Sequence, residues 1–247
     1  MSSDSIKEHE VNHFNALSEE WWNPKGKFRP LHMMNPIRLD YINTQISLEF
    51  DRNLQKPFPY KGLDLLDVGC GGGLITEAMA RLGATVKGID IAHKSIEIAK
   101  THAQAMGLDI NYEHTSIEKL SQTQGKYHII LCMEVLEHVN EPKDFLTFCR
   151  SMLHPNGILI ASTINRNLKS FFLAILGAEY LLHWVPVGTH DWNSFIKPEE
   201  MKNIMGQVGL TWVDTKGFIF HPLLSEWKLS HRDFDVNYVS TCLHKGD

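Results

Sequence analysis

Two carboxylates and one imidazole follow directly on an apolar run in the segment 126–139, which reads KYHIILCMEVLEHV. If a helical turn follows the apolar residues 129–132, then Glu134, Glu137 and His138 stand at i, i+3 and i+4 and share one face. Such a set fits a solvated helix face, a divalent metal site or acid and base groups in catalysis. As metal ligands, two carboxylates suit Mg²⁺ or Mn²⁺, and the histidine also allows Zn²⁺.

A glycine-rich loop follows an earlier apolar run, in the stretch LDVGCGGG at 66–73. Glycines let the backbone turn tightly and approach a ligand, and a helix that begins behind them supplies unpaired N–H groups. Asp90 follows Asp67 by 23 residues and ends a second apolar run, where its carboxylate can accept hydrogen bonds from a ribose diol. A dinucleotide fingerprint would need Gly or Ala where Leu74 or Thr76 stands. The acid before the glycines instead suits a cationic ligand.

Strands that alternate with helices position both motifs. The spacing of apolar residues and glycines predicts strands at 63–69, 84–90, 110–116, 127–132, 157–163, 210–220 and 235–245, and helices at 74–83, 95–107, 142–152 and 197–209. This alternation indicates an α/β protein with a doubly wound, Rossmann-like and mostly parallel sheet of seven strands. In such sheets ligands bind at the carboxyl ends of the strands, so Met133 and the residues after it line the crevice opposite the glycine loop.

The chain is predicted to form one domain, 1–247, with four parts. Residues 1–60 form a lead-in with helices, 61–165 a cofactor-binding core, 166–197 an apolar helical insertion after the fifth strand, and 198–247 a final helix with a pair of strands.

Composition narrows the class of protein. The net charge is −5 and the basic residues are scattered, which argues against a nucleic-acid partner. Four cysteines lie far apart without a C-x-x-C pair, as expected of reduced thiols in the cytosol. The polar N-terminus lacks the apolar core of a signal peptide, so we expect a cytoplasmic protein.

The motifs resemble those of a known family. The pattern D-x-G-x-G-x-G resembles that of S-adenosylmethionine-dependent methyltransferases with a seven-stranded sheet. This resemblance implies that the chain binds S-adenosylmethionine and that its sheet has an antiparallel C-terminal strand. The resemblance narrows to the O-methyltransferases of ubiquinone biosynthesis through CMEVLEHV, LDVGCGGG, WWNPKGKFRPLHMMNPIRLDYI, STINRN, VPVGTHDW, FIKPEE and DVNY. These motifs lie between Phe14 and Tyr238, which is nearly the whole chain.

The resemblance also implies substrates and site residues. The substrates would be polyprenylated phenol and quinol intermediates, methylated at two steps, and the chain would be a candidate member of a ubiquinone-biosynthesis complex. By this resemblance, the residues that contact the cofactor would be Arg38, Gly69, Asp90 and Met133. By the same resemblance, Glu134, Glu137 and His138 would bind a divalent cation, Mg²⁺ or another.

Alternatives remain at several residues. No catalytic residue is assigned, although His138 is a candidate general base because the pKa of histidine is near 6.5; a metal ligand cannot use the same nitrogen as a base. Arg38 either pairs with the cofactor carboxylate or is a surface arginine beside Asp40. The chain as a whole could also be a non-catalytic cofactor-binding assembly subunit or a methyltransferase of another small phenol.

The segment 170–184, SFFLAILGAEYLLHW, is more apolar than a short connection needs and is too short to span a bilayer. It fits a wall for a greasy substrate tail, a helix packed on the core, or an interfacial helix. The last case would make the protein peripheral at the inner face of the cytoplasmic membrane.

Overall fold

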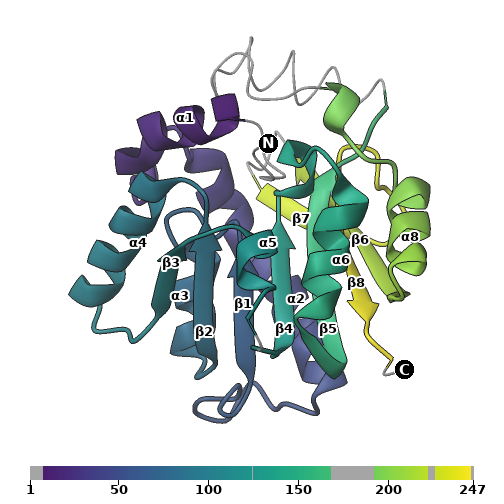
Figure 1. The fold of residues 1–247 in the computed structure, drawn as a ribbon, viewed down its shortest axis with the longest axis horizontal. Helices are drawn as coiled ribbons and strands as arrows, with labels where there is room; N and C mark the ends of the chain where they lie inside the picture. Colours follow the sequence, from purple (N-terminus) through teal and green to yellow (C-terminus); the bar gives the residue numbers. More distant parts are fainter. Residues whose placement is uncertain (1–7, 124, 168–191, 222–225, 246–247) are drawn as a thin grey trace.

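The computed structural model describes residues 8–123, 125–167, 192–221 and 226–245. Within these residues eight strands form a single sheet in the order β3-β2-β1-β4-β5-β8-β6-β7 (Figure 1). The strands are β1 Asp64–Val68, β2 Thr85–Asp90, β3 Asn111–His114, β4 Tyr127–Met133, β5 Leu153–Ile164, β6 Thr211–His221, β7 Glu226–Ser230 and β8 Asn237–Leu243.

The sheet is parallel over its first five strands and antiparallel at its end. Strands β1 to β5 pair in parallel, whereas β8 pairs antiparallel with both β5 and β6. The predicted α/β class and the antiparallel C-terminal pair are therefore confirmed. Strand β7, which pairs with β6 and lies between the last two predicted strands, was not predicted. Strand β5 begins at Leu153, four residues before the predicted strand 157–163.

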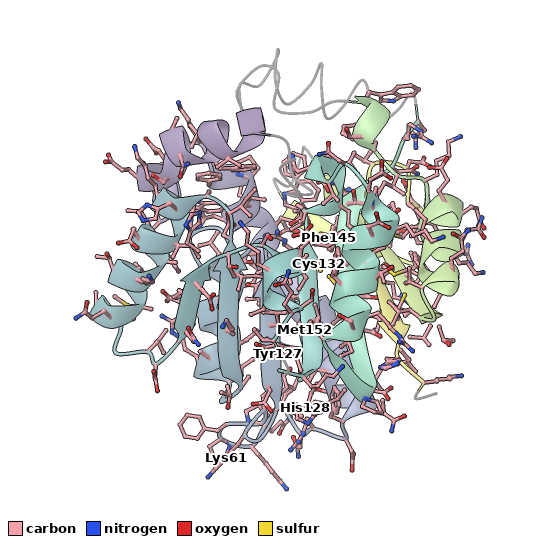
Figure 2. All side chains as sticks on the ribbon, viewed as in Figure 1. Lys61, Tyr127, His128, Cys132, Phe145 and Met152 are labelled. Carbon is pink, nitrogen blue, oxygen red and sulfur yellow. The ribbon has the colours of Figure 1, made fainter. Side chains whose placement is uncertain are left out.

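Helices cover both faces of the sheet. The α-helices described are α1 Glu8–Leu17, α2 Arg29–Glu49, α3 Leu74–Arg81, α4 His93–Ala105, α5 Ile117–Leu120, α6 Pro142–Ser151 and α8 Pro198–Gln207. Helices α2 and α3 pack on one face, and α5, α6 and α8 pack on the other (Figure 1). Figure 2 shows Cys132 of β4 and Phe145 of α6, both buried in the second of these layers.

The two faces follow from the alternation of side chains along each strand. Leu65 packs beneath α2 and α3, while its neighbour Leu66 packs beneath α5 and α6. Ile129 and Ile130 divide in the same way. Each of these four side chains is fully buried, which explains why the strands are continuous apolar runs rather than alternating ones.

The lead-in is more regular than its sequence suggests. Helix α2 runs for 21 residues, with Pro30 in its first turn and Pro36 inside it. Its Tyr41 is buried, and the hydroxyl lies 2.9 Å from Thr241 Oγ1 of β8. This contact anchors α2 across the face of the sheet. The predicted partly helical lead-in is thus confirmed, with α2 as one covering layer.

All four cysteines are free and buried. The apolar segment 170–184 lies outside the described residues, so its predicted helix and membrane contact are not described. In the part of the chain that is described, no helix has the length and apolar character needed to cross a membrane.

Candidate cofactor and methyl-transfer site

The glycine loop between β1 and α3 is held against two neighbouring strands. The N–H groups of Gly69 and Cys70 both donate to the Ile89 carbonyl oxygen, at 2.8 and 3.0 Å. Gly69 has a φ of 73°, and a Cβ there would overlap the Cγ2 methyl of Val135, which follows β4. Glycine is needed at this position both for its conformation and for the close approach of the two segments.

Asp90 ends β2, as predicted, and is held by main-chain donors. Its Oδ2 accepts a hydrogen bond from the Gly71 N–H at 2.8 Å, and its Oδ1 accepts one from the Ala92 N–H at 2.7 Å. Burial raises the pKa of Asp90, and the hydrogen bonds from Ala92 and Gly71 oppose this rise. The carboxylate is therefore fixed in orientation by the backbone before any ligand binds.

Asp67 is a buried acid at the end of β1. Its side chain is 3% exposed, and the Thr76 hydroxyl donates to its Oδ2 at 2.6 Å. Burial raises the pKa of Asp67 to about 6, while Thr76 and Arg38 act in the opposite direction. A cationic ligand nearby would stabilise its charged form further, which supports the expectation of such a ligand behind this loop.

Arg38 of α2 reaches into the same region. It is 4% exposed and forms an ion pair with Glu134, so the alternative of a surface arginine is wrong. Burial lowers its pKa to about 10, and the charges of Asp67 and Glu137 oppose that effect. Because this value lies well above neutral pH, Arg38 remains protonated and supplies a positive charge between the carboxylates.

Glu134 has an unusual backbone conformation directly after β4. Its φ is 53°, in the left-handed region that residues other than glycine seldom adopt. Its N–H donates to Ser162 Oγ at 3.0 Å, and the Ser162 hydroxyl donates to Glu134 Oε1 at 2.7 Å. Ser162 thus holds both the backbone and the side chain of Glu134, which compensates the cost of the conformation.

Glu137 and His138 lie farther along the same connection. Glu137 is 5% exposed and accepts a hydrogen bond from the Thr163 hydroxyl at 2.8 Å. The imidazole of His138 meets the ring of Phe14 in α1 edge to face, with centroids 5.4 Å apart. The lead-in therefore covers the segment after β4 as well as the glycine loop.

The predicted helical turn from Glu134 to His138 is wrong in its first part. Only Leu136–His138 is helical, as a short 3₁₀ helix, and Glu134 stands outside it with a left-handed conformation. Among the described residues, the three side chains do not form a group with ligand atoms within 4.8 Å of one another. The structure brings Glu134, Glu137 and His138 to one edge of the sheet without assembling them around a common point.

Met133 is the last residue of β4 and is 6% exposed, at the edge where the sequence analysis places it. Its register partner in β5 is Ser162. Its contact with a cofactor stays a prediction, as do those of Arg38, Gly69 and Asp90.

Two tryptophans of the lead-in were missed as site residues. The Trp21 indole packs on the loop so closely that a Cβ at Gly71 or Gly72 would overlap it. Its Nε1 donates to Ser95 Oγ at 3.0 Å, and Nε1 of Trp22 donates to the Gly72 carbonyl at 2.9 Å. The adjacent pair of tryptophans before a run of prolines was a visible signal of a segment that packs on something specific.

Ser162 and Thr163 were also missed, although they stand in the quoted stretch STINRN. They are buried at the end of β5, beside the end of β4. The predicted parallel pairing of these strands could have pointed to them as partners of Glu134 and Glu137.

The charges at this edge favour cationic ligands. In the described part of the chain, one guanidinium, that of Arg38, acts on or pairs with Asp67, Glu134 and Glu137, and Asp67 in turn senses the charge of Asp90. Three carboxylates, those of Asp67, Glu134 and Glu137, therefore share the charge of Arg38, and Asp90 adds a fourth negative charge nearby. A ligand with positive groups and one carboxylate would complement this pattern, with its carboxylate at Arg38.

Known proteins match the chain along its length. The methyltransferase domain family model matches residues 39–215. The chain is 52% identical over 244 residues to a ubiquinone biosynthesis O-methyltransferase of Cereibacter sphaeroides, covering 99% of both chains. It is 50% identical over 240 residues to the protein of that name from Ruegeria pomeroyi, covering 97% of both.

Solved structures agree with the fold. Magnesium protoporphyrin IX methyltransferase from Synechocystis PCC 6803 with bound SAM superposes with a TM-score of 0.64 at 16% identity, covering 98% of this chain and 100% of that one. The SAH complex gives a TM-score of 0.66 at 20% identity, covering 95% and 97%.

Proposed function

The chain belongs to the ubiquinone biosynthesis O-methyltransferase family, and on that premise we propose that it methylates ring hydroxyls of polyprenylated catechol and demethylubiquinol intermediates, at two steps. The donor is S-adenosylmethionine, as in the methyltransferases that share its domain and fold. The observation that carries the proposal is the set of buried and partly buried charges at the carboxyl ends of β1, β2 and β4.

Those charges complement the donor. S-adenosylmethionine carries a sulfonium, an ammonium and a carboxylate, together with a ribose diol. Asp67 suits its positive groups, Asp90 suits the diol, and Arg38 suits the carboxylate. Trp21 and Trp22 pack on the glycine loop and hold the lead-in over it, which keeps water from the charged donor.

Methyl transfer is an in-line displacement. A bond forms between the ring oxygen and the methyl carbon while the bond from that carbon to sulfur breaks, and the sulfur keeps the electron pair. The protein must therefore hold the oxygen close to the methyl group and opposite the sulfur. The segment after β4 lies at the same edge as the glycine loop, and Val135 contacts Gly69 there, so this segment is placed to hold the acceptor.

The acceptor must also lose its proton. A phenol with a pKa of about 10 is mostly protonated at neutral pH. His138, at the edge described above and half-buried beneath Phe14, is the candidate to receive that proton if it is not a metal ligand.

A divalent cation is the second way to form the oxyanion. Glu134, Glu137 and His138 fit Mg²⁺ or a related ion in kind, as two carboxylates and an imidazole, but Arg38 holds Glu134 and Thr163 holds Glu137 in the described structure. We propose that these three residues hold the ion once Arg38 releases Glu134. A bound ion would lower the pKa of the ring hydroxyl and orient it.

The test is mass spectrometry of a reaction with purified protein, S-adenosylmethionine and a short-chain prenylated catechol, with Mg²⁺ or with EDTA. We expect a product heavier by one methylene that is lost in EDTA and in Glu137→Gln. The matched control is Glu141→Gln, an exposed acid in the same connection, which should behave as the wild type.

Each outcome decides between hypotheses. Methylation that continues in EDTA would keep the enzyme and reject the cation. Cofactor binding without any product from several catechols would favour a non-catalytic assembly subunit, and a product from other phenols alone would reject the prenylated substrate.

The proposal extends to a membrane surface, because a polyprenyl tail resides in the bilayer. The apolar residues 170–184, which lie outside the described structure, are the proposed contact with the inner face of the cytoplasmic membrane. Membership of the chain in a ubiquinone-biosynthesis complex is a separate part of the proposal. Phe171→Asp with Leu182→Asp should weaken co-sedimentation with liposomes. Unchanged sedimentation of a folded double variant would reject this contact.

A further inference from the structure

A second group of ligand-type side chains lies at the opposite end of the sheet. Asp64 begins β1, while His128 and His154 are the second residues of β4 and β5. One ligand atom of each residue lies within 4.8 Å of those of the other two. Figure 2 shows His128 low in the view, at the amino end of β4, whereas α1 lies at the top of the same view (Figure 1). The group is therefore separate from the carboxyl-end site described above.

The parallel pairing of three central strands creates this group. Strand β4 lies between β1 and β5, so their first residues meet at one edge. The two histidine backbones also converge, because a Cβ at Gly157 would stand 2.9 Å from the His154 carbonyl and 3.0 Å from the His128 carbonyl. Their imidazole centroids are 4.5 Å apart. The side chains are thus brought together by the core of the sheet.

The hydrogen bonds identify which nitrogen of His128 carries no proton. The Asp64 N–H donates to His128 Nδ1 at 3.0 Å, so that nitrogen carries no proton. The Asp64 carboxylate lies 3.4 Å from the same nitrogen. A metal ion at Nδ1 would replace the N–H as its partner, and the partly exposed strand end allows water to receive that N–H.

A third histidine, His244, holds the start of β5, where His154 lies. Nδ1 of His244 lies 3.0 Å from the His154 carbonyl oxygen and must therefore donate to it. Since the proton is on Nδ1, Nε2 of His244 bears a lone pair, and within the described structure this buried atom has no hydrogen-bond partner. His244 follows β8 directly, is 7% exposed and holds the backbone position of His154.

We propose that Asp64, His128 and His154 form a zinc site that ties the amino ends of β1, β4 and β5 together. Two imidazoles and one carboxylate are a common zinc set, and a majority of nitrogen ligands favours zinc over Mg²⁺. Water would complete the coordination, because all three side chains are partly exposed. Asp64 favours a cation and the nearby charge of Arg52 opposes it, so we expect moderate affinity.

The test is zinc binding by isothermal titration in the presence of excess Mg²⁺. We expect the His154→Gln variant to lose at least about tenfold in zinc affinity, because even outer partners of a metal change affinity by about 10- to 100-fold. His231→Gln, at an exposed histidine, is the matched control and should bind as the wild type. Glu137→Gln should also retain the site, which separates it from the proposed catalytic cation.

Thermal unfolding supplies a second readout. Zinc should raise the melting temperature of the wild type and of Glu137→Gln, but not that of His154→Gln or Asp64→Asn. The Asp64 variant provides the test if the histidine variant fails to fold. Equal zinc affinity in the wild type and in both ligand variants would overturn the proposal.

Discussion

The two halves of the carboxyl-end site hold their acids in different ways. At the ends of β1 and β2, Asp90 is fixed by two main-chain N–H groups and Asp67 by a threonine at the start of α3. At the end of β4, Glu134 and Glu137 are held by side chains, namely Arg38 and the hydroxyls of β5. The first half therefore contains one acid, Asp90, that the backbone itself fixes, whereas both acids of the second half depend on side chains that can rotate away.

This difference matches the tasks that we propose for the two halves. A donor that binds identically in every turnover benefits from fixed partners, since preorganised groups lose little entropy on binding. An acceptor half that must admit a substrate, and under our proposal a cation, needs carboxylates whose present partners can be exchanged. Arg38 belongs to both halves, because it pairs with Glu134 and acts on Asp67.

Replacement of Arg38, which both halves share, should have the largest effect on stability. Arg38→Met removes a buried charge and leaves Glu134 without its ion-pair partner, so we expect the free energy of unfolding to fall by about 3 to 5 kcal/mol. Urea denaturation measures this change. Arg38→Lys keeps a positive charge and should be less destabilised. Equal stability of wild type and Arg38→Met would mean that the two halves do not share this residue.

Asp67, the buried acid at the end of β1, should make the free energy of unfolding depend on pH. The pKa of Asp67 is raised to about 6 in the folded protein, so the folded state holds this proton more tightly than the unfolded state does. Its stabilising contribution is present at pH below about 4 and is lost as the pH rises through 6. A shift of about two pKa units corresponds to about 3 kcal/mol.

Asp67→Asn tests this linkage in the cofactor-free protein. The asparagine can accept the Thr76 hydrogen bond but cannot ionise, so the variant should gain stability relative to the wild type as the pH rises from 4 to 7.5. Urea denaturation at both pH values measures the difference. The variant should also bind the cationic cofactor more weakly. A stability difference that stays constant with pH would contradict the raised pKa of this buried acid.

A substitution at Asp90 tests the first half of the site through the binding of S-adenosylmethionine alone. Asp90→Ala removes the carboxylate that the Gly71 and Ala92 amides orient, and we expect the dissociation constant of S-adenosylmethionine to rise about 100-fold, as for the loss of two charge-assisted hydrogen bonds. Isothermal titration measures it. Asp109→Asn, an exposed acid after α4, is the control. A change of less than about threefold would place the ribose elsewhere.

Local sequence signals predicted well where the residues of the first half, at the ends of β1 and β2, lie in the fold. The glycines of the loop and the acids that end β1 and β2 are adjacent in sequence to the strands that position them, so their places follow from short patterns. Arg38 was different, because α2 reaches this edge only by packing across the sheet, and no local pattern reports such packing. Only the family resemblance pointed to it.

The second half of the site, at the end of β4, was predicted less well for a related reason. A left-handed conformation at Glu134 has no sequence signal, since glycine is the residue that usually marks it. The conformation depends on Ser162, which is 28 residues away. Strand β7 was missed because a five-residue strand with charged residues is ordered mainly by its pairing with β6. Register and packing, rather than local preference, decided these elements.

The smallest predicted effect joins the two halves. If the cofactor carboxylate draws Arg38 away from Glu134, then bound cofactor frees that carboxylate for a cation. We expect S-adenosylmethionine to tighten Mg²⁺ binding about tenfold, and Mg²⁺ to tighten cofactor binding by the same factor, because such coupling is reciprocal. Isothermal titrations in both orders measure it, and Arg38→Met should abolish the coupling while Glu141→Gln preserves it. Independent binding of the two ligands in the wild type would show that Arg38 does not pass from one half to the other, and the two halves would then be separate sites at one edge of the sheet.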